Sequence, residues 1–172
     1  PKTEEVIISE SPKGTNKINF IEQNFNFTEV RNNEFFGKSF PMKGTIDANI
    51  PNAKELILAN PKEIAEHATI VDLIRNDLSM VSDNVWVSNY RYFVEIQTQE
   101  GLIGLVSSKI EGTLPENYNE NIGNIIFALL PAGSISGAPK NKTKQIINKA
   151  ENAERGYYTG VAGYFDGTNL DS

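Results

Sequence analysis

The sequence predicts an α+β fold built on antiparallel sheet. The chain has 172 residues, of which 39% are hydrophobic, and this is enough for one compact domain with its own core. Segments typical of strands come in groups rather than alternating singly with helices, and this order favours antiparallel pairing. An Asp-Gly pair at residues 166–167 adds a hairpin turn near the end of the chain.

A hairpin is predicted first, over residues 17–40. Apolar and polar residues alternate on both sides of Arg31-Asn32-Asn33, and asparagine is a common turn residue. Lys43 follows just past the second strand, in the segment SFPMKGTIDA. A long charged side chain at such a place is either a solvated surface charge or an amine held in a pocket.

Two helices are predicted next, and they meet at Asn60. The first begins near Asn52, over the segment AKELILAN. Asn60 has the side chain of an N-cap for the second helix, with Pro61 suited to its first position and Glu63 to its third.

The second helix, over residues 62–81, is predicted to bury one broad apolar stripe. Three polar residues fall outside that stripe, namely Glu66, Arg75 and Asp77. The stripe consists of Ile64, Ala68, Val71 and Leu78, with Ile70 and Ile74 beside it.

Two or three antiparallel strands are predicted over residues 85–98 and 101–114. Both segments are rich in β-branched and aromatic residues, and the sequence QEG separates them. One buried face of this sheet is predicted to carry Trp86, Tyr90 and Tyr92.

The remaining segments predict two helices and a final hairpin. A short apolar helix covers residues 120–133. The glycine-containing loop GSISGAPK, residues 133–140, then opens a helix with Pro139 near its first turn. A strand over residues 157–165 leads through the Asp-Gly turn into a return strand.

Composition disfavours several classes of function. The formal net charge is -6 and no Lys/Arg block is present, so nucleic-acid binding is disfavoured. No long apolar run and no secretory signal is found, which favours a cytoplasmic protein without a membrane span. The absence of cysteine excludes a disulfide scaffold, a thiolate zinc site and a cysteine nucleophile within these residues.

The GSISGAPK loop is a candidate anion site. Gly133 and Gly137 let the backbone approach a ligand closely, and the helix that follows presents N–H groups and a partial positive charge. The spacing fits neither a Walker loop nor the GxGxxG fingerprint. A tight corner between loop and helix explains the same residues, and spacing alone favours that explanation.

Lys43 and Glu66 are the other candidates for chemistry. Lysine is usually solvated, and a nucleophilic lysine needs desolvation or a nearby cation to lower the pKa of its amine. Glu66 precedes His67, the single histidine, and follows Glu63 by one helical turn. This pattern offers at most one oxygen ligand for a hard metal ion, and a solvated helix face is its commoner explanation.

Four blocks, in this order, resemble the chorismate-utilising enzymes: PMKGT, AEHATIVDLIRNDL, LLPAGSISGAPK and RGYYTGVAGYF. That family includes anthranilate, aminodeoxychorismate, isochorismate and salicylate synthases. The resemblance implies antiparallel sheets packed as a sandwich with outer helices, and chorismate and Mg²⁺ bound between them. Residues 1–172 are then expected to be part of a single catalytic domain, a fragment without its C-terminal strands and an N-terminal portion.

The PMKGT block narrows the resemblance to aminodeoxychorismate synthase component I, which carries lysine where anthranilate synthases generally carry alanine. This likeness implies that chorismate and ammonia are converted to 4-amino-4-deoxychorismate, for p-aminobenzoate and folate. It implies that Lys43 is the nucleophile and Glu66 a Mg²⁺ ligand. The implied substrate contacts are Thr45, Ser134, Gly137 and Tyr158.

Other functions stay open at this point. Within the family they are anthranilate synthase and isochorismate synthase, and outside catalysis a chorismate-binding derivative. The last is motivated by Gly104, where many members have a histidine that assists loss of the hydroxyl. Ammonia is expected from a glutamine amidotransferase subunit, component II, because these residues hold no cysteine for glutamine hydrolysis.

Overall fold

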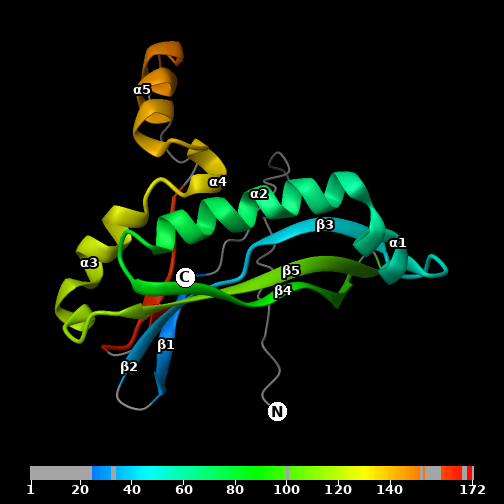
Figure 1. Ribbon diagram of the computed structural model, residues 1–172, viewed down its shortest axis with the longest axis horizontal. Helices are drawn as coiled ribbons and strands as arrows, with labels where there is room; N and C mark the ends of the chain where they lie inside the picture. Colours follow the sequence, from blue (N-terminus) through cyan, green and yellow to red (C-terminus); the bar gives the residue numbers. More distant parts are fainter. Residues whose placement is uncertain are drawn as a thin grey trace.

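The structure is a computed structural model, and it describes residues 25–31, 34–99, 101–151, 153, 160–167 and 170–171 (Figure 1). The strands are β1 (Phe25–Arg31), β2 (Glu34–Ser39), β3 (Met42–Asp47), β4 (Asp83–Thr98), β5 (Gly101–Leu114), β6 (Tyr164–Phe165) and β7 (Leu170–Asp171). The helices are α1 (Ala53–Ala59), α2 (Pro61–Leu78), α3 (Tyr118–Leu129), α4 (Gly133–Ser136) and α5 (Lys140–Ala150).

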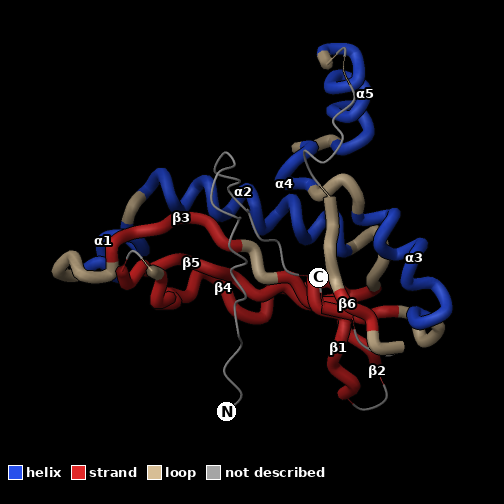
Figure 2. Tube along the Cα trace, turned by 180° about the vertical axis from the view of Figure 1, so that it is seen from behind, coloured by secondary structure: helices blue, strands red, loops and turns tan. Residues whose placement is uncertain are grey.

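β5 is the strand around which the sheet is built. β4 pairs with one edge of β5 along nearly its whole length, while β3 and then β2 pair with the other edge. The described strands form one seven-stranded sheet, which continues from β2 through β1 and β7 to β6 (Figure 2). Because each pair is antiparallel, the predicted α+β class with antiparallel sheet is confirmed.

The predicted first hairpin is confirmed as β1 and β2. Its turn, at residues 32–33, lies outside the described residues, as does the start of the predicted first strand. Lys43 lies just past the second strand, as predicted, and it belongs to β3, because β2 and β3 continue along the same edge of β5.

Pro41 separates β2 from β3 on that edge. Proline has no N–H to donate to the ladder, so the pairing is interrupted there. The Pro41 carbonyl still accepts hydrogen bonds from Ser108 N at 3.1 Å and from the Ser107 hydroxyl at 3.3 Å. Since the proline is also fully buried, the interruption is fixed against β5.

α2 lies across the sheet over β3, β4 and β5 (Figure 1). Its start agrees with the sequence prediction: Pro61 is the first helical residue, and Asn60 Oδ1 accepts from Lys62 N at 3.0 Å and Glu63 N at 3.3 Å. A cap of this kind contributes about 1 kcal/mol to helix stability. The helix ends at Leu78, before the predicted end at residue 81.

The buried face of α2 differs from the predicted stripe. Ile64 is 39% exposed and Ala68 is also exposed, so the prediction is wrong for both. A hydropathy pattern predicts that His67 lies on the polar face of α2. Its actual position depends on a hydrogen-bond partner in the sheet. The apolar positions that α2 buries are Val71, Ile74 and Leu78, and His67 continues the same face by one turn.

α3 closes the main core beside α2 and β5, which confirms the predicted short apolar helix. Large aliphatic side chains from all three elements are buried there, together with one tyrosine. The buried members of this core are Val71, Ile74, Leu78, Ile110, Leu114, Tyr118, Ile125, Leu129 and Leu170.

The aromatic residues of β4 do not form the predicted buried face. Trp86 is 37% exposed and Tyr90 is 50% exposed, so the prediction is wrong for these two. β4 has several register irregularities against β5, and Arg91 has a φ of 50°, so the simple alternation of faces is lost in this part of the strand.

The C-terminal elements are described in part. α5 follows the glycine loop as predicted, points away from the sheet in both views and has no fully buried residue (Figures 1 and 2). Of the predicted strand over residues 157–165, residues 160–163 are irregular and residues 164–165 form β6, while 157–159 lie outside the described residues. β6 and β7 pair on either side of the Asp-Gly turn.

Among the described residues, no single helix has both the length and the apolar character needed to cross a bilayer. The segments 118–136 and 140–150 have this length and apolar character only when they are taken together, and a bend of 68° separates them.

Gly104 of β5 lies against the ring of Phe93 from β4. A Cβ atom at position 104 would stand 2.5 Å from Phe93 Cε2 and closer still to Cζ. The ring therefore fills the space that a side chain at position 104 would take. Glycine at this position is a packing requirement of the sheet.

We expect Gly104→Ala to lower the free energy of unfolding by about 1–3 kcal/mol, because the added methyl group displaces the Phe93 ring. Gly123→Ala is the matched control, since a Cβ there meets nothing within 4 Å. Alanine is also the better helix former by about 1 kcal/mol, so this variant should gain stability. Urea denaturation measures both changes, and equal stability of the two variants would contradict the packing.

Candidate functional site

Lys43 lies at a β-bulge, directly after the proline interruption. Met42 is opposite Ser107 and Thr45 is opposite Leu105, so β3 has one residue more than β5 over this stretch. Gly44 takes up the bulge with a φ of 95°, a conformation that other residues rarely adopt. Bulges re-aim side chains, and this one directs the Lys43 amine toward α2.

Gly44 also allows α2 to approach β3 closely. A Cβ atom at this position would stand 2.8 Å from Glu63 Oε2 and 3.4 Å from Ile57 Cδ1. Two independent constraints therefore favour glycine after Lys43: the positive φ and the contact with the first turn of α2.

The Lys43 amine forms an ion pair with Glu66, with Nζ 2.9 Å from Oε2. Lys62 reaches the other carboxylate oxygen at 3.8 Å. The hydrogen bond with Glu66 raises the pKa of Lys43, and the same bond lowers the pKa of Glu66. The Lys43 side chain is 46% exposed.

The expectation of a desolvated Lys43 amine with a lowered pKa is therefore wrong for this structure. Burial contributes in the expected direction, but the carboxylate at 2.9 Å has the larger effect on the pKa of Lys43. The amine is a protonated ammonium at neutral pH as long as Glu66 remains its partner.

His67, the residue after Glu66, is fully buried between α2 and the sheet. Its Nε2 lies 2.7 Å from Ser108 Oγ, and its Nδ1 lies 3.4 Å from the Lys43 carbonyl oxygen. A carbonyl can only accept, so Nδ1 carries the hydrogen and Nε2 accepts from the Ser108 hydroxyl. Burial lowers the pKa of His67, in agreement with this neutral form.

Arg91 extends the same set of contacts to α1. Its backbone N–H donates to Ser108 Oγ at 2.9 Å, and its φ of 50° is a conformation that few residues other than glycine adopt. Its guanidinium donates to the carbonyls of Leu58 at 3.0 Å and Ile57 at 3.4 Å, near the end of α1. Sequence reasoning missed Arg91 and Ser108, since nothing in their strand segments distinguishes them from ordinary surface residues.

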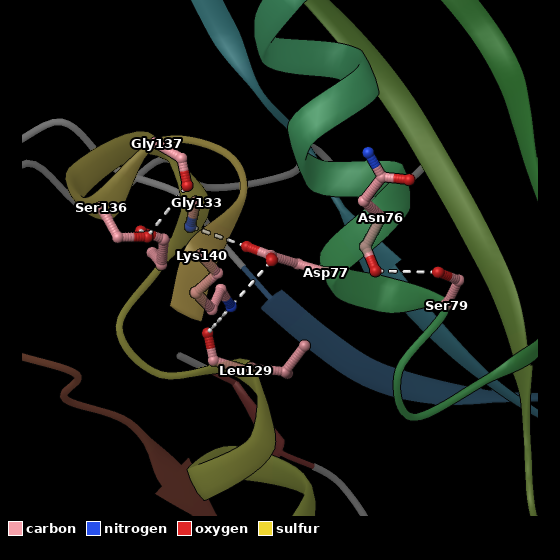
Figure 3. Close-up of polar contacts among 9 residues, drawn as sticks. Asn76, Asp77, Ser79, Leu129, Gly133, Ser136, Gly137 and Lys140 are labelled. Atoms are coloured by element: carbon pink, nitrogen blue, oxygen red, sulfur yellow. Dashed lines mark hydrogen bonds and ion pairs between the residues drawn. The ribbon is translucent and has the colours of Figure 1, made fainter. Parts of the chain in front are cut away.

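The glycine loop is fixed to the last turn of α2 (Figure 3). Asp77 Oδ2 accepts from Gly133 N at 2.7 Å, and Asp77 Oδ1 lies 2.7 Å from Lys140 Nζ. Lys140 Nζ also donates to the Leu129 carbonyl at 2.9 Å. These partners explain why Asp77, outside the apolar stripe, is nevertheless buried.

Ser134 and Gly137, the predicted substrate contacts in this loop, lie within and just after α4. Gly137 has a φ of 74° and its N–H donates to the Gly133 carbonyl at 2.7 Å. The expectation that the Gly137 N–H is available to a substrate carboxylate is therefore wrong for this structure. What the glycine provides is the backbone conformation that ends α4.

The candidate residues fall into two groups along α2. Glu66 lies in the second turn of the helix and Asp77 in the last, about 16 Å apart along the axis. The structure thus brings Lys43 and Glu66 together, and it places the glycine loop at the other end of the helix. Thr45 is exposed on β3 beside Lys43, and Tyr158 lies outside the described residues.

The residues around Glu66 fit a hard cation in part. Glu66 and Glu63 are one turn apart on α2, and both carboxylates face β3, as their contacts with Lys43 and Gly44 indicate. Mg²⁺ prefers oxygen ligands and commonly takes one or two protein carboxylates while keeping several waters. Within the described residues no group of three or more His, Asp or Glu side chains could hold a metal. The two carboxylates are oxygen donors of the type that Mg²⁺ takes, and Glu66 is paired with Lys43 and Lys62.

The chain belongs to the chorismate binding enzyme family, whose model matches residues 26–172. Its fold is also that of solved isochorismate synthases. The menaquinone-specific isochorismate synthase MenF of Escherichia coli superposes with a TM-score of 0.60 at 17% identity, over 87% of this chain and 35% of that one. This likeness confirms the expected fold of the chorismate-utilising enzymes.

Among individual relatives, an uncharacterised PabA-like protein of Haemophilus influenzae is 54% identical over 85% of this chain and 44% of its own length. Aminodeoxychorismate synthase component 1 of Bacillus subtilis is 39% identical over 76% of this chain and 28% of its own. Anthranilate synthase component 1 of Arthrobacter globiformis is 38% identical over 74% and 23%. The chain thus spans less than half the length of these relatives, and its place within one larger domain stays a prediction.

Glu66→Gln is expected to lower the pKa of Lys43 toward its usual value, because the carboxylate that holds the proton is removed. In the unchanged protein the ion pair stabilises the fold above the pKa of a free glutamate, and this contribution is lost as the pH falls through the lowered pKa of Glu66. It is lost again in alkali, as the pH rises through the raised pKa of Lys43.

NMR titration of isotope-labelled lysine amines, with Lys43 assigned by substitution, measures this change. Glu55→Gln, an exposed carboxylate on α1, is the matched control and should leave the Lys43 titration unchanged. An unchanged Lys43 pKa in Glu66→Gln would show that the ion pair does not persist in solution.

Proposed function

We propose that the protein is component I of an aminodeoxychorismate synthase, which converts chorismate and ammonia to 4-amino-4-deoxychorismate and water with Mg²⁺ bound. The observation that carries the proposal is the position of Lys43. Its side chain extends from the bulge of β3, and its Nζ lies 2.9 Å from Glu66 Oε2. The Bacillus subtilis relative named aminodeoxychorismate synthase component 1, at 39% identity, supports it. The product would serve the synthesis of p-aminobenzoate and folate.

Lys43 acts as a nucleophile in this proposal. Its neutral amine forms a bond to C2 of the chorismate ring while the bond from C4 to the hydroxyl breaks, and the hydroxyl leaves with a proton as water. Ammonia then forms a bond to C4 while the bond from C2 to the Lys43 nitrogen breaks. A tethered amine replaces a bimolecular first step, and this arrangement lowers the entropic part of the barrier.

The amine must first lose the proton that Glu66 now helps to hold. Glu66, with Glu63 beside it, would hold Mg²⁺, and its contact with Lys43 would then be released. When bound, the ion would supply positive charge for this carboxylate and for the ring carboxylate of chorismate. His67 keeps the Lys43 backbone fixed during this change, because its contact is with the carbonyl and not with the amine.

Substrate contacts are proposed at both ends of α2. Thr45 follows Lys43 on the same strand, and its exposed side chain can reach a ligand there. Ser134 is proposed to contact a second substrate carboxylate, and Tyr158 to lie beside the ring. Two groups of contacts suit a dianion that extends along the helix.

Ammonia is proposed to come from a separate glutamine amidotransferase subunit, component II. Glutaminases of the usual kind need a cysteine nucleophile, and the 172 residues include none.

A chorismate-binding protein without catalysis is the second candidate. The Phe93 ring occupies the space at Gly104 from which a side chain could assist loss of the hydroxyl. Anthranilate or isochorismate synthesis would need a different fate for the ring at the same site. Relatives named as anthranilate synthases reach 42% identity over 63% of this chain.

The product distinguishes these functions. We expect the full-length protein, given chorismate, Mg²⁺ and ammonia, to form 4-amino-4-deoxychorismate, identified by chromatography and mass spectrometry. Direct formation of anthranilate and pyruvate, or of isochorismate, would overturn the assignment in favour of that activity. Binding of chorismate in calorimetry without any turnover would favour the non-catalytic candidate.

Lys43→Ala is expected to lower ammonia-dependent turnover at least about 10³-fold, because the nucleophile is lost, while binding of chorismate stays within a few-fold. Lys62→Ala is the matched control, since Lys62 also contacts Glu66 but is 75% exposed and lies farther away, at 3.8 Å. It should retain most of the activity. Comparable turnover of the two variants would contradict covalent catalysis by Lys43.

A further inference from the structure

Lys140 is the cation beside the glycine loop, and its position suggests two opposite roles. In a protein that binds a dianion, a lysine at the end of GSISGAPK could contact a substrate carboxylate. The structure instead has this side chain only 15% exposed, with Nζ 2.7 Å from Asp77 Oδ1 and 2.9 Å from the Leu129 carbonyl (Figure 3). An ammonium group has three N–H donors, and these two contacts already use two of them.

Asp77 is occupied on both carboxylate oxygens. Oδ1 pairs with Lys140, and Oδ2 accepts from Gly133 N at 2.7 Å. A Cβ atom at Gly133 would stand 2.8 Å from that second oxygen, so the close approach requires glycine. With 7% of its side chain exposed, Asp77 is a buried charge whose cost is offset by these two partners.

The contacts join the two ends of the loop to one point. Leu129 is the last residue of α3, Gly133 the first of α4 and Lys140 the first of α5, while Asp77 belongs to the last turn of α2. The segment from residue 129 to residue 140 is therefore held near both of its ends by the Asp77 carboxylate and the Lys140 ammonium group. We call this set of contacts the Asp77–Lys140 clamp.

We propose that Asp77 and Lys140 are positioning residues, which hold the loop of Ser134 and Gly137 in its shape against α2, and that Lys140 does not itself bind the substrate carboxylate. Only the statement that this loop meets the substrate rests on the proposed function. Because Glu66 and Asp77 lie on one helix, the clamp also sets the distance from the loop to Lys43 and its partner.

A double-mutant cycle in the full-length protein separates the two roles. Lys140→Met leaves the Asp77 charge buried without its cation, and should lower the melting temperature by several degrees and weaken chorismate binding about 10-fold or more. In Asp77→Asn with Lys140→Met, the uncompensated charge is gone, and an amide oxygen can still accept from Gly133 N. This double variant should regain most of the melting temperature and bind chorismate within about 3-fold of the unchanged protein.

Calorimetry with chorismate and thermal denaturation without it are the two measurements. Lys142→Met, the next lysine of α5, is exposed and serves as the matched control, with no change expected in either. A Lys140→Met variant with an unchanged melting temperature and lost binding, not restored by Asp77→Asn, would make Lys140 a ligand of the substrate and overturn the proposal.

Two further outcomes are also decisive. If Lys140→Met does not fold, a folded double variant supports the clamp and an unfolded one contradicts it. If the unchanged protein does not bind chorismate, the proposed function fails. The melting temperatures of the unchanged protein, Lys140→Met, Asp77→Asn and the double variant still decide whether Asp77 and Lys140 form a coupled pair.

Discussion

The hydrogen bond between His67 and Ser108, 2.7 Å long and fully buried, fixes α2 on the sheet at the point where the candidate site lies. A buried imidazole without a partner would cost free energy, so this contact specifies both the depth and the rotation of the helix. Glu66 is the adjacent residue on α2, and the second imidazole nitrogen faces the Lys43 carbonyl. The relative position of Lys43 and Glu66 therefore follows from a bond that involves neither of their side chains.

The other half of that geometry comes from the backbone of β3. Pro41 stops the ladder, and the bulge at Gly44 turns the strand so that Lys43 meets α2 rather than the solvent edge of the sheet. Lys43 is neither free in solvent nor enclosed in an apolar pocket. It is a half-exposed ammonium held by a carboxylate, and the proposed nucleophile has to be released from this state.

Local signals predicted the parts of the fold that depend on neighbouring residues. The cap at Asn60, Pro61 at the helix start and the two long strands around QEG follow from backbone chemistry over a few positions. The buried stripe of α2 and the aromatic face of β4 could not be predicted in the same way, because they depend on Ser108 and on register shifts across the sheet. The proximity of Lys43 and Glu66 could be predicted only from the family resemblance. The two residues are 23 positions apart in the sequence, and such a separation gives no spacing signal.

The contact of Phe93 with Gly104 constrains the order in which this protein could change during evolution. A larger side chain at position 104 displaces the present ring, so a smaller residue at position 93 would let position 104 become larger without this loss of packing. The reverse order passes through a poorly packed intermediate.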